Sequence, residues 1–265
     1  MTTRQKVPHA DCFVASFFTL SGSGFGQPPR HTFTDRVQAA ADTGYAGIGL
    51  HLNELTDPDW NELGTDDPSE VLAHMSGVLR GTGLDVVEIE FMGGWCDGPG
   101  NPAVAKAAEL VGEVEGHLAT NSVGGHHVSV GEFGAGPAAD PQLAGRGLAE
   151  LAALVAGTGY APAVEAFAWS KIRDYGLVRE IQAIAGTGGA LADTWHASTQ
   201  TAPLTGSPRG RWGRSRLSSS TADTASTKIS WPMHAQPAGC PATVTSTAQA
   251  SSVPSAPQAS PGRGA

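Results

Sequence analysis

The stretch from Asp140 to Trp169, DPQLAGRGLAELAALVAGTGYAPAVEAFAW, contains one complete helix–strand unit. It opens with Asp140 and Pro141, a preferred N-cap residue followed by the residue that best fits the first helical position. Apolar residues then recur at helical spacing until the Gly-Thr-Gly at 157–159, and glycine commonly ends helices. Residues 161–169 form a short, mostly apolar run, which is typical of a buried strand. The stretch therefore predicts a helix that leads into a strand of a parallel sheet.

The same alternation continues along the first 196 residues. The expected strands cover residues 12–20, 45–51, 84–91, 126–133, 161–169 and 189–196. The expected helices cover residues 33–44, 66–83, 101–118, 140–159 and 173–188. We expect Thr34 to cap the first helix, Gly44 to end it, and Asp67 to cap the second. Short apolar strands that alternate with helices indicate a parallel sheet covered by helices.

Two architectures share this pattern, an open doubly wound sheet and a (β/α)8 barrel. A dinucleotide-binding open sheet needs a helix directly after its glycine motif, but SGSGFG at 21–26 is followed by QPPRHT. Polar residues instead follow most of the expected strands, and an active site spread over all strand ends is typical of a barrel. We therefore predict an α/β fold of the (β/α)8 TIM-barrel type that is incomplete, with about six βα units in residues 1–196.

Residues 197–265 have a different composition, without Phe, Tyr or Glu and dominated by Ser, Thr, Ala, Pro and Gly. Such a segment buries too little apolar surface to offset its ordering entropy, so we expect a low-complexity, disordered tail. A barrel of six parallel strands would then have two open edges. On this basis we expect the chain to be poorly stable and inactive.

Charge and composition exclude several classes of function. The first 196 residues contain 10 basic and 24 acidic residues, whereas the tail contains six basic and one acidic. An acidic barrel argues against nucleic acid as a partner. The sequence has no long apolar run and no signal-peptide pattern, and its three cysteines are far apart, so we expect a cytoplasmic protein without membrane spans or disulfides.

The strongest site candidates are two acids and a histidine near the ends of the last two strands. Glu165 lies in an apolar strand, where it is either a structural glutamate that caps a loop or pairs with Lys171, or a metal ligand or general base at the barrel mouth. Asp193 and His196 in LADTWH place a carboxylate and an imidazole at one strand end. Divalent metals bind such oxygen and nitrogen ligands.

Four further residues are candidates for substrate binding. His51 ends a strand, and Glu90 lies nearer the barrel mouth than Glu88 on the same strand face. Alternation turns one of the two histidines at 126–127 inward, and His127 is taken as the candidate. Trp169 would wall the pocket. For each of these residues a packing or salt-bridged role remains the alternative.

Four segments, FTDRVQAAADTGYAGIGLH (33–51), VVEIEF (86–91), VEAFAWSKI (164–172) and ALADTWH (190–196), resemble one family. They are similar to the sugar phosphate isomerase/epimerase group of xylose isomerase-like TIM barrels over about residues 10–196. The resemblance implies that Glu165 and Asp193 bind a divalent ion (Mn, Mg, Co or Zn). It also implies that Glu165 acts as acid/base and that His196 lines the substrate site.

This resemblance implies an isomerase or epimerase that moves a proton next to the carbonyl of a small sugar, sugar phosphate or keto-sugar through an enediolate. A metal-dependent dehydratase or lyase on a polyol or keto acid is the alternative enzyme, and a non-enzymatic interaction role for the tail is a third. A phosphodiesterase would need a basic groove, which the acidic barrel lacks. The sequence leaves a homo-oligomer open.

Codon degeneracy suggests an origin for the tail. Joining the third base of each codon to the first two bases of the next, residues 249–262 permit Ala-Gly-Val-Val-Arg-Ala-Val-Arg-Ala-Ala-Gly-Val-Pro-Gly, an amphipathic helix that ends in glycine. In the same frame, residues 231–247 permit Arg-Leu-Pro-Gly-Asp-Gly-Asp-Leu-Asp. Both strings resemble what the family carries between its seventh and eighth strands. We therefore hypothesise that the reading frame shifts by one base shortly after His196.

Resequencing the gene tests this hypothesis directly. We expect a one-base insertion or deletion in the codons just after His196, with the seventh and eighth βα units encoded downstream in the restored frame. A verified sequence in which the tail is read in frame without error would contradict it.

Overall fold

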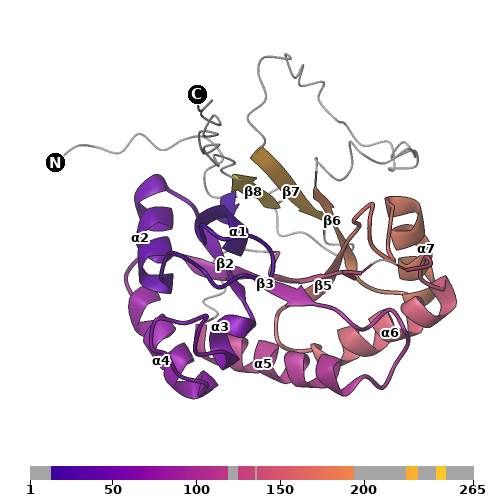
Figure 1. Cartoon of the computed structure of the whole chain (residues 1–265), viewed down its shortest axis with the longest axis horizontal. Helices are drawn as coiled ribbons and strands as arrows, with labels where there is room; N and C mark the ends of the chain where they lie inside the picture. Colours follow the sequence, from indigo (N-terminus) through magenta and orange to yellow (C-terminus); the bar gives the residue numbers. More distant parts are fainter. Residues whose placement is uncertain (1–12, 119–124, 135, 194–224, 232–242, 249–265) are drawn as a thin grey trace, which may run out of the picture.

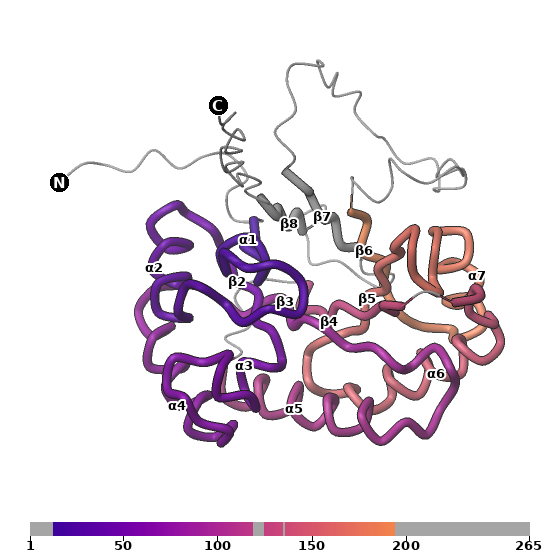
Figure 2. Tube along the Cα trace, viewed as in Figure 1, coloured from indigo at the N-terminus to yellow at the C-terminus, as the bar shows by residue number. Residues whose placement is uncertain are grey.

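The computed structural model describes residues 13–118, 125–134, 136–193, 225–231 and 243–248, and six parallel strands alternate with helices in it (Figure 1). The parallel strands are β1 (Phe13–Ala15), β2 (Gly47–His51), β3 (Asp85–Met92), β4 (His127–Val130), β5 (Ala161–Glu165) and β6 (Gly189–Asp193). The helices are α1 (Phe17–Leu20), α2 (Phe33–Thr43), α3 (Asn53–Thr56), α4 (Pro68–Leu79), α5 (Pro102–Leu118), α6 (Pro141–Leu154) and α7 (Tyr175–Ala185). Figure 2 shows the chain passing around the sheet in sequence order from α2 to α7. The predicted incomplete (β/α) barrel is confirmed.

The helix ends have the expected types of capping residue, but one cap lies two residues earlier in the sequence than predicted. Asp140 accepts hydrogen bonds from the backbone nitrogens of residues 142 and 143, and Asp67 caps α4 in the same way. Gly44 ends α2 in the left-handed conformation, at φ 84°. The prediction that Thr34 caps α2 is wrong, because the helix begins at Phe33 and the side chain of Thr32 accepts from Asp35 N at 3.0 Å. Thr34 instead donates to Glu62 at 2.8 Å.

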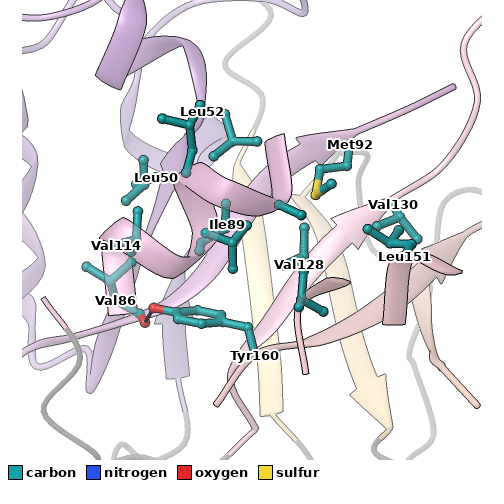
Figure 3. Packing of buried hydrophobic residues seen from close by; sticks show 14 of the residues in the cluster. Leu50, Leu52, Val86, Ile89, Met92, Val114, Val128, Val130, Leu151 and Tyr160 are labelled. Atoms are coloured by element: carbon teal, nitrogen blue, oxygen red, sulfur yellow. Dashed lines mark hydrogen bonds between the residues drawn. The ribbon is translucent and has the colours of Figure 1, made fainter. Parts of the chain in front are cut away.

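Side chains along each strand alternate between the core under the helices and the inside of the barrel. One set of strand residues packs against the helices and is apolar, as Figure 3 shows for Leu50, Ile89, Val128 and Val130. The alternate set faces the inside of the barrel, because successive strand residues point to opposite faces. The buried polar members of that set are His51, Glu88, Glu90, His127, Ser129, Glu165 and Asp193. The helix-facing core therefore stabilises the fold, and the barrel interior carries the chemistry.

Two segments of the tail pair with the edges of the sheet. β7 (Ala225–Trp231) pairs antiparallel with β6 and with β8 (Thr243–Ala248), and β8 pairs parallel with β1. The barrel is thereby closed, so the two open edges, on which the expectation of low stability and inactivity was based, are occupied. Both segments contain the β-branched residues that favour strands, and the unpaired backbone of β1 and β6 supplies hydrogen-bond partners. An antiparallel hairpin is nevertheless not two βα units.

The packing of α6 depends on two glycines. A Cβ at Gly147 would overlap the backbone carbonyl of Trp95, and one at Gly145 would overlap the side chain of Ile184. Trp95 itself is buried in the loop after β3. Helix α6 therefore lies closer to its neighbours than any larger residue at these positions would allow.

We expect Gly147→Ala to destabilise the protein by about 1–3 kcal/mol, because the overlap is with backbone that cannot rotate away. The matched control is Gly77→Ala in α4, where a Cβ meets nothing within 4 Å. Removing a helical glycine there should raise stability by about 0.5–1 kcal/mol. Urea unfolding followed by far-ultraviolet circular dichroism measures both variants. Equal stability of the two would contradict the close approach.

Candidate functional site

Glu165 and Asp193 end two neighbouring strands and lie on the same face. Glu165 is level with Leu191 on β6, and Asp193 follows two residues later, so both side chains face the barrel interior. Their exposed fractions are 1% and 3%. Lys171, the alternative structural partner of Glu165, instead donates to both carboxylate oxygens of Asp97 at 2.8 Å. The two predicted metal ligands are therefore brought together at the carboxyl end of the sheet.

Helix α7 holds the end of β6 in place. The hydroxyl of Tyr175 donates to the carbonyl of Leu191 at 2.7 Å and accepts from the backbone nitrogen of Asp193 at 3.1 Å. Tyr175 is buried, so both hydrogen bonds are shielded from water. Asp193 thus has a fixed backbone position. His196, the third residue of this predicted group, lies outside the described residues.

Trp169 lies at the rim of the barrel, at one end of a series of aromatic rings. Its ring centroid is 5.8 Å from that of Phe167, which is 4.8 Å from Phe133. Phe133 in turn contacts Phe91 at 4.3 Å and Phe25 at 4.0 Å. These rings come from the loops or ends of four different strands. Trp169 is 51% exposed, so it offers a ring face to solvent at the mouth.

His51 and Glu90 occupy one level at the carboxyl ends of β2 and β3, where their Cα atoms are paired. The Nδ1 atom of His51 accepts a hydrogen bond from the backbone nitrogen of Asn53 at 3.1 Å. Its ring stacks on Trp60, with centroids 4.6 Å apart, and contacts Phe17 at 5.3 Å. The sequence therefore placed both residues correctly at the end of their strands.

Burial and, to a smaller extent, the nearby charge of Arg36 lower the pKa of His51 to about 4. Arg36 forms a buried ion pair with Glu54, and its guanidinium lies over the rings of Phe17 and Phe33. Glu54 also accepts from the backbone nitrogen of His51 at 2.9 Å. Burial raises the pKa of Glu54, and Arg36 opposes that shift. The pair fixes the loop that follows β2.

The ion pair between Arg36 and Glu54 was not predicted from the sequence, although the sequence contains a signal for it. The buried stripe of α2 contains Phe33, Val37 and Ala40, and Arg36 occupies a position of the same stripe. A charged residue at a core position needs a buried partner. The helical pattern identifies Arg36, but only the fold shows that Glu54 is its partner.

His127 is the first residue of β4, so it lies at the amino end of the strand. Its Nδ1 bonds to the carbonyl of Gly125 at 3.0 Å, and its Nε2 is 3.4 Å from a carboxylate oxygen of Glu88. Ser129 donates to that same oxygen at 3.0 Å. Because active sites of βα barrels lie at the carboxyl ends of the strands, this position favours a structural role over the predicted substrate contact.

Glu132 is a buried acid at the mouth that sequence reasoning did not select. It follows β4 and accepts from the backbone nitrogens of Gly94 at 2.7 Å and Cys96 at 3.2 Å. Burial, followed by the charge of Glu132, raises the pKa of Cys96 to about 12, so the thiol stays protonated. Glu132 thus holds the loop after β3. Its place within the GEF triplet at residues 131–133, at the end of a strand, was the available signal.

Two of the described acids, Glu165 and Asp193, are of the type that could hold a metal ion. No group of three or more His, Cys, Asp or Glu side chains within the described ranges is close enough to hold an ion. Glu165 and Asp193 provide oxygen ligands of the type that divalent ions bind. They are the two predicted metal ligands, and His196, which was predicted to line the substrate site, lies outside the described residues. Among the described helices, none combines the length and apolarity needed to cross a membrane.

Comparison with known proteins identifies the class of fold. No protein-family model matches the chain, and no curated protein sequence does either. Among solved structures, it is similar to a xylose isomerase domain-containing protein of Salmonella typhimurium LT2, with a TM-score of 0.53 and 15% identity. That match covers 71% of this chain and 62% of the other, so the chain spans less than two thirds of that protein.

A second similar structure is the apo form of a 3-keto-D-glucoside 4-epimerase from E. coli. The TM-score is 0.50 and the identity 13%, and the match covers 73% of this chain and 72% of the epimerase. The chain thus has the fold of the xylose isomerase-like TIM barrels, as the resemblance predicted. At these identities the likeness establishes the fold and leaves the reaction to be argued from the site.

The lowered pKa of His51 predicts a pH dependence of stability. The unfolded state takes up a proton near pH 6.5 and the folded state only near pH 4, so stability present above pH 6.5 is lost as the pH falls through that window. Between pH 7 and pH 5 this costs about 2 kcal/mol. His51→Phe removes the titrating group, so the wild type should lose about 2 kcal/mol more than this variant in urea unfolding. Equal losses of stability in the wild type and the variant would contradict the lowered pKa of His51.

Proposed function

We propose that this barrel is the framework of a divalent-metal-dependent isomerase or epimerase that acts on a small sugar or keto-sugar. The observation that carries the proposal is the pair Glu165 and Asp193, which are 1% and 3% exposed at the carboxyl ends of adjacent strands. Two carboxylates so deeply buried on one face are costly unless a cation or a proton offsets their charge. A catalytic cation at the barrel mouth explains why these acids stand there.

The charge balance of the interior supports a bound cation. Glu88, Glu90, Glu165 and Asp193 are each at most 3% exposed. Within the described residues the one buried arginine is Arg36, which already pairs with Glu54. His127 lies beside Glu88, at the far end of the strands from Asp193. A cation at the mouth would offset part of the negative charge of these buried acids.

The proposed roles follow from these positions. Glu165 and Asp193 hold the cation, and Glu165 also takes the proton from the carbon next to the substrate carbonyl. A bound divalent cation stabilises the negative charge that develops on the substrate oxygen. Return of the proton to the former carbonyl carbon, with the hydroxyl proton passing to the former carbonyl oxygen, gives isomerisation. Return to the same carbon on its other face, by a second acid, gives epimerisation.

Four of the remaining predicted residues would bind the substrate in this proposal. His51 and Glu90 lie at one level on β2 and β3, where they can contact hydroxyl or carbonyl oxygens. Trp169 offers an exposed ring at the rim, on which the apolar face of a sugar can pack. His196 keeps its proposed role beside the substrate. His127, at the amino end of β4, is left out of the site.

We expect Mn²⁺ or Mg²⁺ to raise the free energy of unfolding of the full chain, by about 2.7 kcal/mol when the ion is present at 100 times its dissociation constant. Glu165→Gln and Asp193→Asn should each abolish most of this gain. The control is Glu109→Gln, a 68% exposed acid on α5 that should keep it. An equal gain in all three variants would place the ion elsewhere and contradict the proposal.

The reaction is tested with the same proteins and the ion. In D2O, enolisation exchanges the proton next to a carbonyl for deuterium, and NMR of 3-keto-D-glucose records this loss even without net conversion. Exchange by the wild type and none by Glu165→Gln supports Glu165 as the base. Loss of water from the substrate instead of exchange would identify a dehydratase.

A further inference from the structure

The hydrogen bonds of His51 determine which of its ring nitrogens carries the proton. Nδ1 lies 3.1 Å from the backbone nitrogen of Asn53. A backbone N–H can only donate, so Nδ1 must be the acceptor and carries no proton. A neutral imidazole has one proton, which therefore lies on Nε2. The fold thus selects a single tautomer with an N–H donor at Nε2.

This donor is available to a ligand. Within the described part of the chain, no protein atom pairs with Nε2 of His51. The residue is 92% buried, yet Nε2 is not among the side-chain nitrogens sealed from water. The ring plane is held by Trp60, stacked at 4.6 Å, and by Phe17. A fixed ring therefore presents one N–H to solvent at the carboxyl end of β2.

The surroundings keep the ring neutral. Arg36 of α2 disfavours a second positive charge, and Glu54 of α3, which would favour one, is already paired with Arg36. Glu90 of β3 is level with His51 along the sheet. A neutral donor beside an acid on the next strand suits an uncharged hydroxyl or carbonyl oxygen better than a phosphate, which the carboxylates would repel.

We propose that His51 positions the substrate by donating a hydrogen bond from Nε2–H to an uncharged hydroxyl or carbonyl oxygen of the sugar. This inference rests on the proposed function and deepens it, because it assigns the donor atom and favours an unphosphorylated substrate. It also separates His51 from proton transfer. The imidazole keeps its proton and orients the sugar while Glu165 acts as the base.

Two substitutions distinguish hydrogen bonding from ring packing. His51→Gln keeps an N–H donor near the position of Nε2 and loses the ring, whereas His51→Phe keeps the ring and loses the donor. With Mg²⁺ present, calorimetry should show 3-keto-D-glucose binding about tenfold more weakly to His51→Phe and within about threefold of wild type to His51→Gln. A packing role alone predicts the reverse order.

The tautomer is tested on the wild type without any variant having to fold well. Two-bond ¹H–¹⁵N NMR of the ¹⁵N-labelled chain should show His51 with the proton on Nε2 from pH 8 to pH 5.5, and added 3-keto-D-glucose should shift Nε2 more than Nδ1. A proton on Nδ1, or a doubly protonated ring at pH 6, would overturn the inference.

The outcomes separate this inference from the proposed function. Equal binding of the probe by wild type and His51→Phe overturns the donor role and leaves the proposed function standing. Absence of binding by the wild type overturns both. Tighter binding of a phosphorylated sugar than of 3-keto-D-glucose overturns the preference for an uncharged ligand.

Discussion

The whole structure depends on the alternation of side chains along six parallel strands. One set of residues, such as Ile89 and Val128, is apolar and packs beneath the helices. The other set faces inward and includes four carboxylates that are each at most 3% exposed. Because successive strand residues point to opposite faces, the same strands that build the hydrophobic core also direct acids to the barrel interior. Core and chemistry are therefore coupled, and a shift of one residue in register would exchange them.

Burying so many acids is tolerated because several have specific partners. Glu54 pairs with Arg36, Glu88 contacts His127, and Glu132 accepts two backbone N–H groups of the loop after β3. The contact of Glu88 lies toward the amino ends of the strands, that of Glu54 lies beside β2, and those of Glu132 hold one loop at the barrel mouth. Glu165 and Asp193 lie on β5 and β6, and the proposed cation would bind there.

The sequence predicted the βα order well because helix caps and strand composition are local signals. The predictions from the sequence failed where contacts between distant parts of the chain determine the structure. Thr34 was expected to cap α2, but Glu62 from the following loop draws its hydroxyl away and Thr32 takes that role. His127 was expected near the substrate, but its strand begins at that residue, so it lies at the wrong end. Strand ends cannot be located from composition to within a few residues.

The sequence by itself determined the six βα units, the acids at the ends of β5 and β6, and the change of composition after His196. Those features depend on local spacing, which the chain carries wherever it folds. Only the tertiary structure decided that Arg36 pairs with Glu54, that His51 holds its proton on Nε2, and that β7 and β8 close the sheet. Each of these features depends on which groups come into contact when the chain folds. A buried charge needs a partner of opposite sign, the proton of an imidazole lies on the nitrogen that does not accept a hydrogen bond, and an open strand edge pairs with any strand that reaches it.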